Sequence, residues 1–135
     1  MKQQEPDDKQ EFLVISRGQW DPDATQEQVQ QAIDDFYVWY EHNLAEGRMK
    51  RGSRLAPGGK LVSRRSVIDG PFAEAKEVVG GFWFIIASNL AEAARIASEN
   101  PCLAFGLTLE VRPLEQARAV ADSLTNETPV AWRSQ

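Results

Sequence analysis

The chain has 135 residues, the length of one domain, and its 42% hydrophobic and 26% charged residues are typical of a folded globular protein rather than a disordered or collagen-like one. Its formal net charge of -5 disfavours binding to nucleic acid or to an anionic membrane. A single cysteine excludes an intrachain disulfide, and no Cys/His group has metal-ligand spacing, so we expect a cytoplasmic protein without a metal or other cofactor.

The first part of the chain predicts one strand and one long helix. Residues 1–10 are polar and acidic, unlike a signal peptide, and we expect them to form a flexible lead. The apolar, β-branched run FLVIS at 12–16 predicts the first strand. Thr25 and Gln28 have the spacing of a capping box, and Gly47 marks the end of the helix that follows. The apolar side chains of this helix recur every three or four residues, at Val29, Ile33, Phe36, Tyr40 and Leu44.

The middle of the chain predicts further strands. Residues 49–68 contain short strand-like pieces around the turn signal APGG, which predict two strands or one irregular hairpin. The run GGFWFIIAS at 80–88 predicts the most apolar strand of the chain. Because no helix is predicted directly after Gly80 and Gly81, we expect these two residues to form a bend or bulge rather than a phosphate-binding loop.

The last predicted elements are a second helix and a final strand. Asn89 and Glu92 repeat the capping spacing for a helix at 90–100, and Pro101 is expected to end it. Residues 106–113 alternate between apolar and polar side chains, which predicts a strand with one buried face. The apolar positions of this strand are Leu107, Leu109 and Val111.

Together these elements predict an α+β domain at residues 11–115, followed by a C-terminal extension at 116–135. The order βαββαβ is that of the ferredoxin-like plan, an antiparallel sheet with two helices on one face. The strands at 12–16 and 82–86 are apolar on both sides, so the second face of the sheet also needs a cover. The C-terminal extension is one candidate cover. We expect a second copy of the chain to cover this face instead, which gives a homodimer with sheet packed against sheet.

A long motif in the middle of the sequence resembles a known family. DGPF at 69–72, followed by Glu74, the pair Lys76 and Glu77, and the glycine pair at 80–81, is similar to the YCII-related proteins of the DGPF type. The resemblance covers residues 11–115 and includes EGRM at the end of the first helix. It implies a ferredoxin-like domain that dimerises through its sheets as an α/β barrel. It also implies lyase- or isomerase-like relatives, and a sigma factor as a partner of some members.

The resemblance further implies a His–Asp pair, with the histidine early in the first long helix. This chain has Phe36 and Tyr37 there, and its only histidine, His42, lies near the end of the helix. Position 42 points away from the apolar face, so we expect a solvated or interface histidine. We expect the lone Cys102 to be an inert, partly buried thiol, because no candidate base lies near it in sequence.

Asp69 is the candidate catalytic residue. It follows an apolar strand end, where a carboxylate can be partly desolvated and act as a general base. The alternative is a purely structural corner, because Asp, Gly and Pro are all turn-forming residues. The accompanying candidates for ligand binding are Gly70, Pro71, Phe72, Glu74, Lys76 and Arg65. For the charged members of this group the alternative is a solvated loop with weak ion pairs.

Basic residues are concentrated at 48–65, in a stretch without Asp or Glu. One interpretation is that Arg51, Arg54, Arg64 and Arg65 bind a small anion such as a carboxylate. The other is a solvated hairpin that balances acidic groups of a partner subunit. No aromatic side chains are interleaved among these cations, so the segment does not resemble a nucleic-acid platform.

These observations lead to two functional hypotheses. The first is a dimer that binds a small anionic or aromatic molecule in a cleft near Asp69, between helix and sheet. Any catalysis there would be proton transfer of lyase or isomerase type, with Asp69 as the base and Lys76 or an arginine stabilising negative charge. The second is a non-catalytic binding or interaction module that serves a transcription regulator such as a sigma factor.

Overall fold

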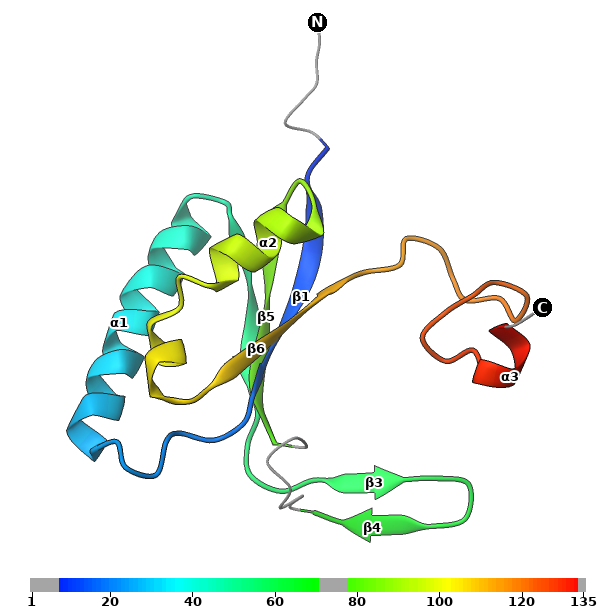
Figure 1. Ribbon diagram of the computed structural model, residues 1–135, viewed down its shortest axis with the longest axis horizontal. Helices are drawn as coiled ribbons and strands as arrows, with labels where there is room; N and C mark the ends of the chain where they lie inside the picture. The colour runs from blue at the N-terminus through cyan, green and yellow to red at the C-terminus, as the bar shows by residue number, and fades with distance from the viewer. Residues whose placement is uncertain (1–7, 71–77, 134–135) are drawn as a thin grey trace, which may run out of the picture.

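A computed structural model of the chain describes residues 8–70 and 78–133, and shows an α+β fold. Its main sheet has four strands, and all neighbouring strands are antiparallel. The two main helices lie together beside this sheet (Figure 1). In spatial order the strands are β2 (Met49–Arg54), β5 (Val79–Ala87), β1 (Gln10–Arg17) and β6 (Thr108–Pro113).

The helices begin at the predicted caps. In α1 (Gln26–Ala45), Thr25 Oγ1 accepts from the Gln28 amide at 3.0 Å, and Gln28 Oε1 accepts from the Thr25 amide at 2.8 Å, which completes the capping box. In α2 (Leu90–Ala97), Asn89 Oδ1 accepts from the Glu92 amide at 2.8 Å. This helix ends before Pro101, which instead opens the short 3-10 helix η3 (Pro101–Phe105), because proline fits the first turn of a helix.

One face of the sheet forms the core with both helices. Side chains of β1 and β5 alternate between buried and half-buried, as a strand period of two requires. Ile85 and Val14 are completely buried at the centre. They pack in one cluster with Tyr40 of α1 and Ile96 of α2, so the two helices share this face. The predicted burial of Leu109 and Val111 on β6 is confirmed, since both pack against the cluster.

The opposite face of the sheet carries a second set of apolar side chains, which we call the open face. These side chains are half-buried and come from β1 and β5: Leu13, Ile15, Phe82, Phe84 and Ile86. The C-terminal tail does not cover them, because it extends away from the sheet towards α3 (Val130–Arg133) (Figure 1). The tail itself exposes Leu124, Val130 and Trp132.

A separate hairpin projects from the end of the main sheet (Figure 1). It consists of β3 (Lys60–Val62) and β4 (Val67–Asp69), and all six of these residues are exposed. Four of the six are apolar and have exposed fractions between 52% and 71%: Leu61, Val62, Val67 and Ile68. The sequence left open whether 49–68 forms two strands or one hairpin; the structure has β2 in the main sheet and a distinct hairpin after it. An isolated two-stranded hairpin is only marginally stable, so this one is suited to contact another surface.

Polar groups at one edge of the open face form an ion cluster around Glu110 of β6. Arg17 Nε lies 2.5 Å from Glu110 Oε1, and Arg112 Nη1 lies 2.7 Å from Oε2. The hydrogen bond from Arg17, then that from Arg112, lowers the pKa of Glu110 below its usual value of 4.5. Because the folded pKa lies below the unfolded one, the cluster stabilises the fold above pH 4.5 and loses this effect as pH falls through the folded pKa.

We therefore expect Glu110→Gln to be less stable than the wild type at pH 7, by about 1 kcal/mol or less for such a half-exposed cluster. The difference should shrink as the pH is lowered, since acid neutralises the wild-type carboxylate. Urea unfolding of both proteins across the acid range measures it. A difference that stays constant down to the lowest pH would contradict the role assigned to this carboxylate.

Candidate functional site

A cavity of about 800 Å³ lies between α1, η3 and the helix-facing side of the sheet. Its residues come from segments far apart in sequence, including Ser16 on β1, Arg54 on β2, Trp83 on β5 and Cys102 on η3. Its volume is in the range of pockets that hold small organic ligands. The cavity is therefore the candidate site in the part of the chain that the structure describes.

One wall of the cavity is aromatic. Phe36 and Tyr40 lie one helical turn apart on α1, and their rings stack with centroids 5.3 Å apart. Trp83 meets both of them edge to face, at 5.4 Å from Phe36 and 6.0 Å from Tyr40. These rings are packed in or against the core and also line the cavity. Such a wall offers flat apolar surface to a ligand.

Trp83 also carries an unpaired polar atom. Its side chain is 5% exposed, and its Nε1 has no hydrogen-bond acceptor among the described residues. A buried donor without an acceptor costs about 1–3 kcal/mol, and buried indole N–H groups usually have a partner. Trp83 lines the cavity as a residue, whereas its Nε1 atom is covered by protein, so an acceptor on a bound molecule reaches this N–H only if the indole or its neighbours shift.

Two bulges shape the sheet beside the cavity. The register between β1 and β5 shifts after Ser16, which leaves Gly80 as the extra residue, and the register between β2 and β5 shifts between Lys50 and Ser53. The predicted bulge at the glycine pair is thus confirmed. A Cβ on Gly81 would lie 2.8 Å from the Ser53 carbonyl oxygen, so β2 approaches too closely for any side chain there.

The charged groups at the cavity differ in their partners. Arg51 pairs with Glu41 at 2.9 Å, and this hydrogen bond and charge raise the pKa of the Arg51 guanidinium. No carboxylate among residues 8–70 and 78–133 forms an ion pair with Arg54. Burial raises the pKa of the Cys102 thiol, and the charge of Arg54 only partly opposes the shift. The thiol therefore stays protonated near neutral pH, which agrees with the inert role expected for it.

We compared the chain with protein-family models, solved structures and curated proteins. A scan against protein-family models matches residues 12–123 to the YCII-related domain. The chain belongs to the YCII-related family. Among solved structures it is similar to the hydroxynitrile lyase from Passiflora edulis, with a TM-score of 0.40 and 14% identity, over 82% of this chain and 98% of that chain. A search of curated proteins finds no match.

The predicted site residues of this YCII-related protein lie elsewhere, as far as they are described. Asp69 ends β4 on the projecting hairpin, where its carboxylate pairs with Lys60 and its side chain is 76% exposed. It is not among the residues that line the cavity. The Gly70 amide donates to the Gly59 carbonyl at 2.7 Å, and Arg65 is exposed in the hairpin turn.

The strand end that carries Asp69 was expected to leave its carboxylate partly desolvated, but this strand belongs to the detached hairpin, where the Asp69 side chain is exposed. Four further candidates lie outside the described residues: Pro71, Phe72, Glu74 and Lys76. The catalytic role of Asp69 and the ligand-binding role of the others stay predictions. The sequence singled out Arg54 among several cations but gave Ser16 no role in a site. The glycine pair at 80–81 was the sequence feature that indicated a bulge at the end of the sheet where the cavity lies.

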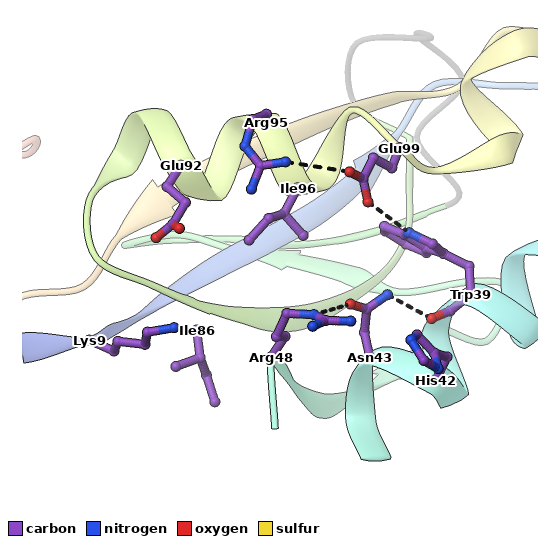
Figure 2. A pocket seen from close by; sticks show the side chains of 10 residues that line it. All are labelled: Lys9, Trp39, His42, Asn43, Arg48, Ile86, Glu92, Arg95, Ile96 and Glu99. Carbon is purple, nitrogen blue, oxygen red and sulfur yellow. Dashed lines mark hydrogen bonds and ion pairs between the residues drawn. The ribbon is translucent and has the colours of Figure 1, made fainter. Parts of the chain in front are cut away.

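A second, smaller cavity of about 400 Å³ lies between the end of α1 and α2 (Figure 2). Its polar groups satisfy one another: Arg48 Nε donates to Asn43 Oδ1 at 2.8 Å, and Asn43 Nδ2 donates to the Trp39 carbonyl at 2.8 Å. Trp39 Nε1 in turn donates to Glu99 Oε1 at 3.4 Å. His42 lies at the rim and is exposed. This network links the helices and explains the cavity without a ligand.

Two classes of site have no support in the described part of the chain. No group of three or more His, Cys, Asp or Glu side chains gathers there in a way that could hold a metal ion. None of the helices described there is long and apolar enough to span a lipid bilayer.

Proposed function

We propose that this YCII-related protein binds a small anionic or aromatic molecule in the cavity between α1 and the sheet. The observation that carries the proposal is the cavity of about 800 Å³ with its aromatic wall, beside a buried Trp83 N–H that lacks an acceptor among the described residues. A ligand with an acceptor atom on a flat apolar body supplies both the missing hydrogen bond and the ring contacts. Binding would therefore satisfy a group that has no acceptor among residues 8–70 and 78–133.

Acid–base chemistry of lyase or isomerase type is the finer form of this proposal. It needs a base near the ligand, and Asp69 remains the residue proposed for that role. The carboxylate of Asp69 would have to reach the cavity from the projecting hairpin, and in this structure it pairs with Lys60 instead. Binding alone is therefore the function that the geometry of the described residues supports best.

We also propose a ferredoxin-like domain that dimerises sheet against sheet as an α/β barrel in the cytoplasm. The strand order β2-β5-β1-β6 supports the first part. The apolar open face supports the second, since two copies related by a twofold axis would bury the same five side chains on each side. The ion cluster around Glu110 then lies at the rim of the interface, where charged groups are common.

The alternative, a non-catalytic interaction module for a sigma factor, rests on the apolar residues of the hairpin and tail. Leu61, Val62 and Trp132 are between 54% and 71% exposed. Exposed apolar patches commonly mark protein-binding surfaces. The homodimer uses the open face instead, so the two proposals concern different parts of the molecule.

The indole N–H of Trp83 provides the test of ligand binding. We expect benzoate or phenol, added to the ¹⁵N-labelled protein, to shift the Trp83 indole resonance, because the ligand supplies its missing acceptor. Trp83→Phe assigns the signal and should weaken binding about tenfold through loss of one hydrogen bond to a charged acceptor. Trp132→Phe is the matched control, since Trp132 lies on α3, outside the cavity. An unmoved Trp83 signal at about 10 mM of either compound, which detects even millimolar affinity, would contradict the proposal.

A further inference from the structure

We propose that the ligand of this cavity is a small organic acid whose carboxylate is held at the Gly80 bulge by the Arg54 guanidinium and the Ser16 hydroxyl. The inference rests on the proposed function and names the class of molecule that the site takes. The apolar or aromatic body of the acid lies against the wall formed by Phe36, Tyr40 and Trp83. The anion subsite and the aromatic wall are then two parts of one cavity.

The two polar side chains come together because of the strand register. Gly81 on β5 pairs with Ser16 on β1 and with Arg54 on β2, so the three residues form one row across the sheet. Residues directly opposite one another in a sheet project to the same face. Since Gly81, the middle residue of the row, has no side chain, no side chain of β5 separates Ser16 from Arg54, and the backbone of β2 lies close to Gly81 instead.

Gly80 defines the space between them. A Cβ built on Gly80 would lie 3.4 Å from Arg54 Nη1 and 3.8 Å from Ser16 Oγ. One point in the cavity thus lies within contact distance of a guanidinium nitrogen and a hydroxyl oxygen. Because this point is one bond length from Gly80 Cα, a carboxylate would lie further out in the cavity, where the Arg54 guanidinium and the Ser16 hydroxyl can both donate to it.

The charge of Arg54 is available for a ligand. The other two cations of β2 have carboxylate partners, Lys50 with Glu11 at 2.9 Å and Arg51 with Glu41 at 2.9 Å. Arg54 has no such partner in the described part of the chain. A guanidinium stays charged at any physiological pH, and its planar fork matches a carboxylate.

The rest of the cavity favours an organic acid over a polyphosphate or nucleic acid. It offers one unpaired guanidinium together with an aromatic wall, a combination that suits one negative charge on an apolar body. The net charge of -5 on the whole chain disfavours a highly charged anion. The Trp83 N–H remains for a second acceptor atom of the same molecule.

Calorimetric titration with benzoate and with benzyl alcohol, its neutral counterpart of similar size, tests the inference. We expect the wild type to bind benzoate at least about tenfold more tightly, because hydrogen bonds to charged groups are stronger than neutral ones. Arg54→Gln should remove this preference and leave the affinity for benzyl alcohol unchanged. Arg64→Gln is the matched control, because Arg64 lies in the hairpin turn and does not line the cavity, so it should keep the preference.

Gly80→Ala provides a second variant that keeps every charge. Its methyl group would occupy the space between Arg54 and Ser16, so we expect it to weaken benzoate about tenfold and benzyl alcohol much less. If Arg54→Gln does not fold, Gly80→Ala decides the question alone. Equal affinity of the wild type for the two compounds, or a preference that survives both substitutions, would overturn the inference and leave the proposed binding function intact. Failure of both compounds to bind would overturn the two together.

Discussion

Replacing Gly52 by alanine is expected to destabilise the protein by about 3 kcal/mol or more, or to prevent it from folding. A Cβ on Gly52 would overlap the carbonyl oxygen of Phe82 on β5 and would lie 2.6 Å from the carbonyl carbon. Both are backbone atoms of the central strand and cannot move aside without breaking the pairing of β2 with β5. Gly52 also donates its amide to the Tyr40 hydroxyl at 3.3 Å, so a shift of β2 would disturb the cavity wall.

Urea unfolding followed by circular dichroism measures this effect. Gly80→Ala is the matched control, because its Cβ would meet only side-chain atoms, Arg54 Nη1 at 3.4 Å and Ser16 Oγ at 3.8 Å, and its backbone needs no left-handed conformation. We expect the control to remain within about 1 kcal/mol of the wild type, as a small clash with a flexible group requires. Equal stability of the Gly52 and Gly80 variants would contradict the statement that β2 lies too close to β5 at Gly52 for a side chain.

Phe84→Asp is expected to convert a dimer into monomers. Phe84 lies in the middle of the open face, in edge-to-face contact with Phe82 at 6.1 Å and 5.6 Å from Lys50 Nζ. If two sheets pack together there, the substitution places a carboxylate in each half of the interface, where the nearby cation Lys50 already pairs with Glu11. A buried unpaired charge costs several kcal/mol, so the dissociation constant should rise about 100-fold or more.

Light scattering coupled to gel filtration measures the change in mass. Val38→Asp is the control, because Val38 is 73% exposed on α1, outside the sheet, and its replacement should leave the dimer intact. Circular dichroism should show both variants folded, since Phe84 is already half-buried rather than buried in a single copy. A wild type that is monomeric at micromolar concentration would refute the sheet-to-sheet dimer, and a Phe84→Asp dimer as tight as the wild type would place the interface elsewhere.

Local signals predicted the elements of this fold well. The caps at Thr25 and Asn89 mark where the helices begin because a capping side chain bonds an amide only three residues away. The alternation in β6 predicted its buried face for a similar reason, since it depends on strand geometry alone. Residues 60–69 were harder, because their strand-like composition does not state whether they pair with the main sheet or with each other.

The site was predicted less well, because it depends on which strands are neighbours. Asp69 was chosen for its place after an apolar strand, but β4 lies on the detached hairpin. Ser16 and Arg54 become neighbours only through the strand order β2-β5-β1, which separates them by one glycine. The unpaired state of the Trp83 N–H is a property of packing and has no sequence signal.

The glycines at the cavity differ in how readily a larger residue can replace them. This difference limits how the sequence around the cavity can change during evolution. Side chains at Gly52 and Gly81 would meet backbone atoms, whereas a Cβ at Gly80 would meet only side-chain atoms of Arg54 and Ser16. A lineage can therefore alter the size of the binding site at one position while the strand pairing stays the same. Changes in the size of this cavity would then come from Gly80 and its neighbour Arg54 rather than from residues of the core.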